Sequence, residues 1–174
     1  PRVARGELCF CIGMSEPDSG SDLFAAKTRA EKVQGGWRIN GRKLWTSGAH
    51  QADYMIGLFR TSQSTKENRR HGLTQFLVPL TATDGITIRP VINAAGRHDF
   101  NEVIFEDAVI GEDHQLGEVD SAWKQATSEL AYERSGSERF LETIHVLVEL
   151  IRAMGDNPSP RDAASLGRLV AQLH

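Results

Sequence analysis

A loop rich in glycine and serine is the segment best equipped for chemistry. Residues 13–25 read GMSEPDSGSDLFA and directly follow a strand-like stretch, ELCFCI, at residues 7–12. Small residues and hydroxyls of this kind let backbone N–H groups approach an anionic or heteroaromatic ligand closely. The structural alternative is a Pro-Asp-Ser-Gly turn followed by a helical turn that Asp22 caps. The residue types alone favour neither interpretation.

Several common kinds of active site have no signature in this sequence. Neither the G-x-G-x-x-G pattern of a Rossmann nucleotide site nor the P-loop of an NTPase occurs. No Ser-His-Asp order is recognisable, and the histidines lack metal-ligand spacing. The six histidines stand at positions 50, 71, 98, 114, 145 and 174. We therefore expect neither a metal site nor a serine hydrolase.

The first part of the chain, about 115 residues, has the pattern of antiparallel strands. Gly, Asn or Asp interrupt the β-branched and aromatic residues about every 8–12 residues, a spacing typical of a sandwich or barrel. Asn40-Gly41 is a strong hairpin signal, because a type I′ turn needs positive φ at both central residues. We expect a strand through residues 43–47 to follow. Alternation would place Trp45 and Ser47 on one side of it and the Thr46 side chain on the other.

The hydrophobic period changes at Ser121. From there apolar residues recur at three- and four-residue steps, which predicts a long amphipathic helix with an interruption near Gly136. Gly155 and the Pro-containing segment 156–160 end it, and a second helix follows. About 50 residues cannot form a four-helix bundle alone, so we expect these helices to need partners outside this sequence.

Composition narrows the class of protein. The 174 residues are 40% hydrophobic and 25% charged, with a formal net charge of −3. This is ordinary globular composition without a phosphate-neutralising face, so nucleic acid is a poor candidate partner. No apolar stretch is long enough to span a membrane, and the chain starts PRVAR without methionine. We expect an internal piece of a cytosolic protein, or of a mitochondrial matrix protein if it is eukaryotic.

Four motifs resemble the acyl-CoA dehydrogenase family, and they occur in the family's order. They are GMSEPDSGSDLFA at 13–25, WRINGRKLWTSGA at 37–49, NEVIFED at 101–107 and AYERSG at 131–136. The resemblance implies an α+β fold. An antiparallel, sandwich- or barrel-like middle β-domain would occupy residues 1–118. Residues 119–174 would be the first helices of an incomplete C-terminal helix bundle.

The resemblance also implies that the protein binds FAD. In the family, a hydroxyl at the position of Ser15 donates a hydrogen bond to the flavin ring, and a tryptophan at the position of Trp45 packs against that ring. Thr46 would reach the ring through its backbone. The residues expected at the cofactor are Met14, Ser15, Trp45, Thr46 and Ser47.

Three further residues are matched to the substrate side. Ser21 resembles the residue that touches the pantetheine arm of the acyl-CoA, and Arg134 resembles the family's arginine at the substrate site. Glu133 matches one of two family locations of the catalytic base, which removes the α-proton of the thioester. The other location would lie beyond His174. The alternative role for Glu133 is that of an ordinary carboxylate on a helix surface.

The activity implied is FAD-dependent oxidation of an acyl-CoA to a trans-2-enoyl-CoA, with electrons passed to an electron-transfer flavoprotein. The family is usually tetrameric, so we expect a homo- or hetero-tetramer in the longer enzyme and no activity from this chain alone. Two alternatives remain open. One is a flavin oxidase of the same fold, and the other is a non-catalytic partner subunit of a heteromeric dehydrogenase.

Overall fold

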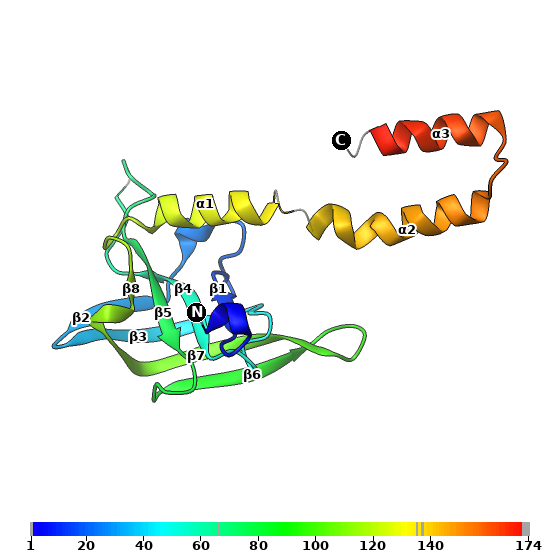
Figure 1. Cartoon of the computed structure of the whole chain (residues 1–174). Coiled ribbons are helices and arrows are strands. Elements are labelled where there is room, and N and C mark those ends of the chain that lie inside the picture. The colour runs from blue at the N-terminus through cyan, green and yellow to red at the C-terminus, as the bar shows by residue number, and fades with distance from the viewer. Residues whose placement is uncertain (1, 66, 135, 137, 172–174) are drawn as a thin grey trace. The chain divides into compact units, whose positions relative to one another are not determined.

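The computed structural model describes residues 2–65, 67–134, 136 and 138–171; the side chains of residues 133, 134 and 138–141 lie outside this description. The contacts divide the chain into two compact units, Pro1–Ala126 and Thr127–His174. Strands build the first unit and helices the second (Figure 1).

One mixed β-sheet forms the first unit. Within the described residues it has eight strands in the spatial order β6-β7-β3-β2-β4-β5-β8, with β1 paired to β4. Neighbouring strands are antiparallel, except that β1 and β2 run parallel to β4. The expected α+β fold is confirmed, with these two parallel pairings added to the antiparallel sheet. The strands are β1 (Phe10–Gly13), β2 (Arg29–Val33), β3 (Gly36–Lys43), β4 (Tyr54–Arg60), β5 (Leu73–Pro79), β6 (Ile86–Ile92), β7 (His98–Gly111) and β8 (Gln115–Leu116).

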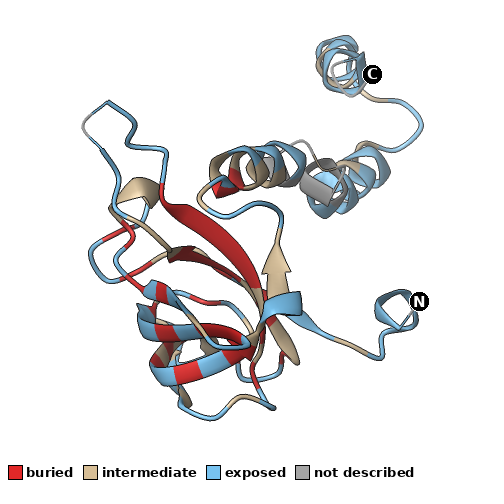
Figure 2. Cartoon of the chain, turned by 90° about the vertical axis from the view of Figure 1, so that its left-hand side faces the viewer, coloured by how far each residue is buried: buried red, intermediate tan, exposed pale blue. Residues whose placement is uncertain are grey.

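Aromatic side chains from the central strands form the core of this unit. Phe59, on β4, contacts Phe76 and Phe105 edge to face, with ring centroids 5.9 Å and 5.6 Å away. Trp37 packs edge-on against Phe76 at 5.0 Å. Buried and more exposed residues alternate along parts of the strands (Figure 2). Burial of these rings fixes the register, because a slip of one residue would turn every core side chain outward.

The β2–β3 hairpin turns at Gln34-Gly35, where the glycine-containing segment 34–36 predicts a turn, and not at Asn40-Gly41. Val33 pairs with Gly36, so the turn consists of Gln34 and Gly35, and Gly35 has a φ of 79°. The strand β3 then continues through Asn40-Gly41 instead of starting after it. The prediction of a turn at Asn40-Gly41 is therefore wrong.

Asn40 and Gly41 instead form an irregularity opposite β7. The register shifts between Ile39 and Gly41, and the Asn40 side chain donates to Asp107 Oδ1 at 3.0 Å and accepts from the Asp107 N–H at 2.9 Å. Gly41 has a φ of 131°, and a Cβ there would lie 2.8 Å from the Cα of Thr28. Glycine can adopt the positive φ that a β-bulge needs as well as the positive φ that a tight turn needs. The same Asn-Gly pair can therefore form either feature.

Short 3₁₀ helices connect some strands: η1 (Val3–Arg5), η2 (Leu23–Ala25) and η3 (Glu112–His114). The helical turn expected after Asp22 is η2. The Asp22 side chain makes no cap hydrogen bond to it and instead pairs with Arg69, Nη2 to Oδ2, at 2.8 Å. The loop is therefore tied to the segment before β5 as well as to its own turn.

The helices are α1 (Ala122–Arg134), α2 (Glu138–Met154) and α3 (Pro160–Ala171). The interruption expected near Gly136 is confirmed, because α1 and α2 are separate helices on either side of it. Gly155 adopts a φ of 65° just after α2, and the Ser159 hydroxyl accepts from the Asp162 N–H at the start of α3. Apolar side chains along α2 and α3 are exposed within this chain, including Val146 at 70%. None of the described helices is long and apolar enough to span a membrane.

Candidate functional site

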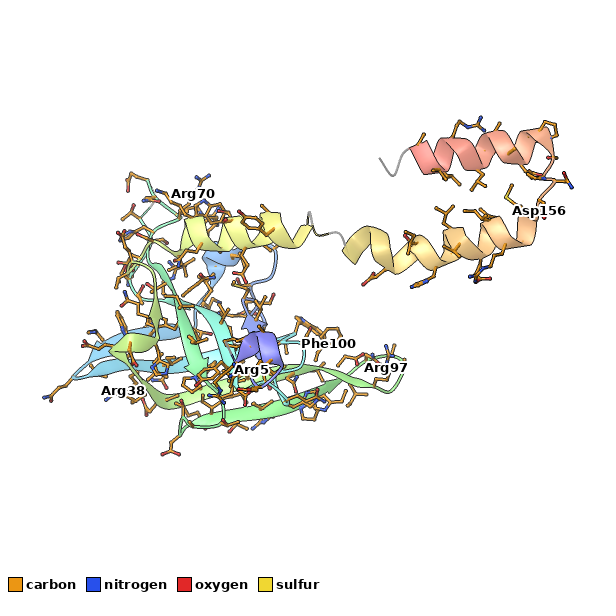
Figure 3. The ribbon with its side chains drawn as sticks, in the orientation of Figure 1. Arg5, Arg38, Arg70, Arg97, Phe100 and Asp156 are labelled. Atoms are coloured by element: carbon orange, nitrogen blue, oxygen red, sulfur yellow. The ribbon has the colours of Figure 1, made fainter. Side chains whose placement is uncertain are left out.

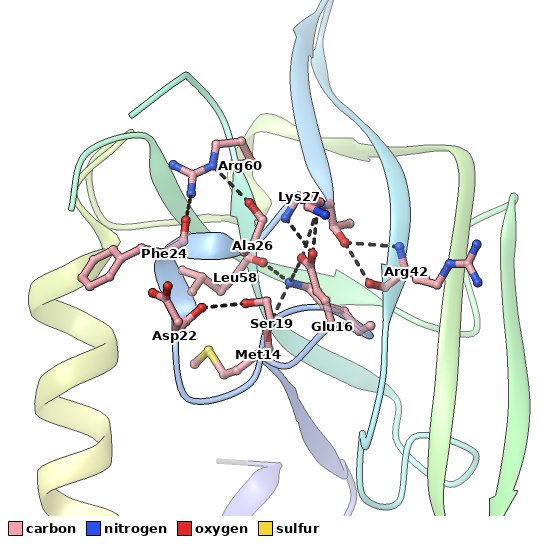
Figure 4. A network of polar contacts seen from close by, with 12 residues as sticks. Met14, Glu16, Ser19, Asp22, Phe24, Ala26, Lys27, Arg42, Leu58 and Arg60 are labelled. Carbon is pink, nitrogen blue, oxygen red and sulfur yellow. Dashed lines mark hydrogen bonds and ion pairs between the residues drawn. The ribbon is translucent and has the colours of Figure 1, made fainter. Parts of the chain in front are cut away.

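A buried ion pair lies beneath the 13–25 loop. The side chains of Lys43, on β3, and Glu16, in the loop, are 0% and 5% exposed, and Lys43 Nζ lies 2.8 Å from Glu16 Oε1. Lys43 also donates to the carbonyl oxygens of Leu58 and Met14, the latter at 3.3 Å. Glu16 accepts the backbone N–H groups of Lys27 and Thr28 (Figure 4). Every donor of the ammonium group is thereby used, as a fully buried lysine requires.

The two charges of this pair respond differently to burial. Burial alone would raise the pKa of Glu16, but the attraction of Lys43 and the hydrogen bonds from Lys43, Lys27 and Thr28 outweigh it and lower the pKa. Burial lowers the pKa of Lys43, and Glu16 opposes that change. The geometry is that of an ionised pair, because Glu16 accepts only N–H donors.

Arg60 holds the far end of the same loop. Its guanidinium donates to the carbonyl oxygens of Phe24 at 2.5 Å, Ala26 at 3.2 Å and His71 at 3.0 Å. Within the loop, the Ser19 hydroxyl donates to the Asp22 carbonyl at 2.8 Å. Figure 4 shows the contacts of Arg60 with Phe24 and Ala26 and the contact of Ser19 with Asp22. The loop is therefore fixed along its length and can present Met14 and Ser15 in a defined position.

The two segments predicted to face the flavin lie side by side. The Leu44 N–H donates to the Ser15 carbonyl at 2.9 Å, directly after β3 ends at Lys43. Trp45 follows in a left-handed conformation, with φ at 61°, and its side chain is 56% exposed. The indole and the Phe100 ring lie nearly perpendicular to each other, with a centroid distance of 5.9 Å. Positive φ is uncommon for a bulky residue and often marks a functional segment.

The sequence prediction for residues 45–47 is thus wrong about secondary structure. These residues lie in a loop and not in a strand, so strand alternation does not position Trp45 and Ser47. Among the described residues, the hydroxyls of Ser15 and Ser47 have no protein hydrogen-bond partner. Both remain available to a ligand beside the exposed indole.

Thr46 is the buried member of this loop. Its N–H donates to the Asn101 carbonyl at 3.0 Å, and its own carbonyl accepts the backbone N–H and the side-chain amide of Asn101 at 3.0 Å and 2.9 Å. Its hydroxyl is buried and has no partner among the described residues. The backbone that was expected to reach the flavin ring is already paired.

Asn101 and two histidines are the residues that sequence reasoning missed. Asn101 is fully buried on β7, and its side chain contacts His50 and His98 as well as Thr46. The available signal was weak, because Asn101 is one of several polar residues among the apolar ones of β7. Figure 3 labels the neighbouring Phe100, which marks this end of β7.

The structure describes the residues predicted at the substrate only in part. Ser21 is exposed in the loop before η2. Glu133 and Arg134 form the last two positions of α1, and their side chains lie outside the described residues. In the described ranges no cluster of His, Cys, Asp or Glu could hold a metal ion.

An open depression of about 390 Å³ lies beside the charged residues of the 13–25 loop. Its lining residues are Glu16, Pro17, Asp18, Lys27, Thr28, Gly41 and Arg42. None of the five residues predicted at the cofactor belongs to it. The predicted flavin contacts Met14, Ser15, Trp45, Thr46 and Ser47 therefore lie outside this depression, and we call them the platform.

Comparisons with known proteins show the family of this chain. Residues 11–108 match the family described as acyl-CoA dehydrogenase, middle domain. The chain belongs to the acyl-CoA dehydrogenase family. Acyl-CoA dehydrogenase FadE34 of Mycobacterium tuberculosis is 36% identical over 173 residues, covering 98% of this chain and 24% of that protein. Acyl-CoA dehydrogenase IpdE1 of the same species is 37% identical over 169 residues, covering 93% and 43%.

Solved structures of family members are also similar. The Tcur3481-Tcur3483 steroid ACAD has a TM-score of 0.80 at 28% identity, covering 99% of this chain and 45% of that one. The ChsE4-ChsE5 complex from Mycobacterium tuberculosis has a TM-score of 0.67 at 33% identity, covering 76% and 33%. The chain thus spans less than half the length of these relatives. The platform described above belongs to the family's middle domain.

Proposed function

We propose that this chain supplies the flavin-facing surface of an FAD-dependent acyl-CoA dehydrogenase that converts an acyl-CoA to a trans-2-enoyl-CoA. The observation that carries the proposal is the exposed indole of Trp45 in segments that also carry Ser15 and Ser47, whose hydroxyls have no hydrogen-bond partner among the described residues. An apolar wall flanked by hydrogen-bond donors suits a planar heteroaromatic ring with polar edges. In the proposed arrangement, residues 1–118 form the middle domain and residues 119–174 begin the helical domain.

Each flavin-side residue has a defined task in this proposal. When bound, FAD supplies the acceptor for the hydride that leaves the substrate's Cβ. Trp45 would cover one face of the ring, and the hydroxyls of Ser15 and Ser47 would donate hydrogen bonds to it. Met14 borders the ring beside Ser15, with its carbonyl held by Lys43. Thr46 keeps its neighbours in place, because its own backbone is bound to Asn101.

The substrate-side residues do the proton chemistry and the binding. Glu133 accepts the α-proton of the thioester, and Arg134 lies at the substrate site beside it. Ser21 contacts the pantetheine arm from the exposed loop before η2. Proton removal by a positioned carboxylate contributes about 10²–10⁴-fold to a rate. Electrons then pass to an electron-transfer flavoprotein.

Anaerobic reduction of the flavin by an acyl-CoA tests this function in the full-length protein. We expect the wild type to bleach, and Glu133→Gln to retain FAD and acyl-CoA while bleaching about 10²–10⁴-fold more slowly. Glu142→Gln, an exposed carboxylate change on α2, is the matched control and should bleach normally. Wild-type bleaching in Glu133→Gln would move the base to a position beyond His174.

A non-catalytic partner subunit is the second candidate. Its support is that two similar solved structures are named for two chains each, ChsE4-ChsE5 and Tcur3481-Tcur3483. In that role the protein would belong to a heteromeric assembly. If it is instead the catalytic chain of an enzyme with one kind of subunit, it would form a homo-tetramer. Copurification with a second dehydrogenase chain, together with absence of FAD reduction by the separated protein, would favour the partner role.

Two finer questions concern the substrate and the acceptor. The steroid ACAD among the similar structures makes a steroid-derived acyl-CoA a candidate substrate beside fatty acyl-CoA. Comparing the rates of flavin reduction by both classes decides between them. A flavin oxidase of the same fold is separated by mixing reduced enzyme with oxygen, because an oxidase reoxidises rapidly and a dehydrogenase slowly.

A further inference from the structure

Two arginines and two aromatic rings meet at the start of α1, and we call these four residues the arginine–aromatic cluster. The rings of Phe24, in η2, and Trp123, in the first turn of α1, lie at a centroid distance of 4.4 Å. The guanidinium carbon of Arg70 lies 5.0 Å from the centre of the Trp123 ring, and that of Arg69 lies 6.0 Å from the centre of the Phe24 ring. Figure 3 labels Arg70, and Figure 4 shows the Phe24 ring beside α1. All four residues belong to the first compact unit.

Neighbouring polar contacts connect the segments that carry the cluster. The Arg60 guanidinium donates to the carbonyl oxygens of Phe24 and His71, so it joins η2 to the segment before β5. Asp120, just before α1, accepts the Thr61 hydroxyl at 2.6 Å and lies 3.5 Å from His71. The four side chains are therefore held near one another before any ligand arrives, which lowers the cost of binding one.

The charge of Arg70 is not neutralised within the part of the chain that the structure describes. Arg69 forms an ion pair with Asp22, Nη2 to Oδ2, at 2.8 Å. The exposed Arg70 guanidinium forms neither a hydrogen bond nor an ion pair with any described residue, and its contact is with the Trp123 ring. An arginine in contact with a ring keeps its N–H donors for the oxygen atoms of an anion such as a phosphate.

These residue types suit a phosphorylated adenosine. Guanidinium groups bind phosphate oxygens through paired hydrogen bonds, and nucleotide bases stack on aromatic rings and on guanidinium planes. The position of the cluster in the chain supports the same ligand, because Ser21 directly precedes Asp22, the partner of Arg69. In coenzyme A, a pyrophosphate joins the pantetheine arm to a phosphorylated adenosine. An arm that contacts Ser21 would therefore bring the phosphates toward Arg69 and Arg70.

A second basic surface lies beyond η2 and suits a nucleotide less well. It is an open depression of about 360 Å³, lined by Ala26, Lys27, Arg29, Arg60, Gln63 and Ser64. None of these side chains is aromatic, so nothing in the depression could stack on an adenine ring. Arg29 is exposed on β2 and provides a control for attraction by charge alone.

We propose that Arg69, Arg70, Phe24 and Trp123 bind the phosphorylated adenosine end of the acyl-CoA. Arg70 contacts phosphate oxygens, and the aromatic rings and guanidinium planes support the adenine. The cluster thereby makes the enzyme select thioesters of coenzyme A over thioesters of pantetheine alone. That the nucleotide belongs to the enzyme's substrate rests on the proposed function, whereas binding of coenzyme A by the cluster does not.

Calorimetric titration of the full-length protein with coenzyme A tests the site. Arg70→Gln should raise the dissociation constant about 10-fold, the effect of losing a hydrogen bond to a charged group. Arg70→Lys keeps the charge without the planar group and should recover only part of the loss. Arg29→Gln, the matched control, should stay within about 2-fold of the wild type, because an exposed charge outside the site contributes little. Thermal melting should be unchanged in all three variants, since both arginines are exposed.

Flavin reduction by two thioesters of the same acyl group gives the second readout. In Arg70→Gln, the acyl-CoA concentration for half-maximal reduction should rise about 10-fold while the maximal rate stays at the wild-type value. The acyl-pantetheine, which lacks the nucleotide, should reduce wild type and Arg70→Gln alike. A structural role for Arg70 would instead change the reaction of both thioesters.

Three results would overturn this assignment. One is equal affinity of the wild type and Arg70→Gln for coenzyme A. Another is a loss in Arg29→Gln as large as that in Arg70→Gln, which would make the attraction one of general charge. The third is an equal change for acyl-CoA and acyl-pantetheine in Arg70→Gln. If neither thioester reduces the wild-type flavin, the proposed function fails, and the titration with coenzyme A alone decides the role of the cluster.

Discussion

Lys43 and Trp45 are two residues apart, yet the fold places them in opposite environments. The Lys43 side chain is 0% exposed and pairs with Glu16, whereas Trp45 is 56% exposed with φ at 61°. Tryptophan is highly buried on average, whereas lysine is almost never fully buried unless it is paired, as Lys43 is with Glu16. In the proposed function, the exposed side chain is the one that contacts the ligand.

The buried ion pair and the exposed indole have different roles in the site. The charges of Glu16 and Lys43 have all their partners inside the protein and hold the loop and β3 together. Trp45 packs at nearly a right angle to Phe100 and is still 56% exposed, so about half of its surface remains for a ligand. The charged residues Glu16 and Lys43 therefore support the platform, whereas the indole of Trp45 and the neighbouring hydroxyls would contact the ligand.

Removal of the buried ammonium should have the largest effect on stability. Lys43→Met leaves the Glu16 carboxylate buried without its partner, which typically costs about 3–5 kcal/mol of unfolding free energy. The double variant Glu16→Gln, Lys43→Met removes both charges and should recover most of that loss. Urea unfolding measures both. A single variant as stable as the wild type would mean that the pair does not hold the platform.

Trp45→Gly should affect flavin binding and stability in different ways. Loss of the aromatic wall should weaken FAD binding by about 1–3 kcal/mol. Unfolding free energy should stay within about 1 kcal/mol, because glycine relieves the left-handed strain while it adds chain entropy to the unfolded state. Calorimetry measures FAD binding, and thermal melting of the same preparation measures stability. Normal flavin content with a lower melting temperature would make Trp45 a core residue.

The ion pair should also shape the pH dependence of stability. The pKa of Glu16 is lower in the folded protein, so its contribution is complete above the ordinary glutamate pKa of about 4.3 and is lost as pH falls through the lowered value. Glu16→Gln should be less stable at neutral pH and lose less stability on acidification. Glu7→Gln, which removes an exposed pair with Arg5, serves as the control and should leave the acid transition near its wild-type position. Identical acid transitions in wild type and Glu16→Gln would contradict this assignment.

Ser47→Ala should give the smallest effect. The hydroxyl has no protein partner among the described residues, so stability should change by less than about 0.5 kcal/mol. FAD affinity should fall by about 0.5–1.5 kcal/mol, the value of one hydrogen bond. The exposed Ser64→Ala is the matched control and should leave FAD affinity unchanged. Equal FAD affinity in both variants would remove Ser47 from the site.

Sequence patterns predicted the larger features of this molecule and missed particular local ones. Hydrophobic periods located the sheet and the helices, because burial of side chains dominates both. The prediction of a turn at Asn40-Gly41 is wrong because the same dipeptide fits a bulge when a neighbouring strand supplies Asp107 as a hydrogen-bond partner. The pairing of Thr46 with Asn101 joins residues 55 positions apart, and no local pattern reveals such a contact.

A structure of the protein with FAD bound tests the central claim most directly. We expect the isoalloxazine ring to lie against Trp45 within about 4 Å. At least one of the hydroxyls of Ser15 and Ser47 should lie within about 3.5 Å of a ring heteroatom. A flavin bound elsewhere, with Trp45 covered by protein side chains, would contradict the assignment of this platform as the cofactor site.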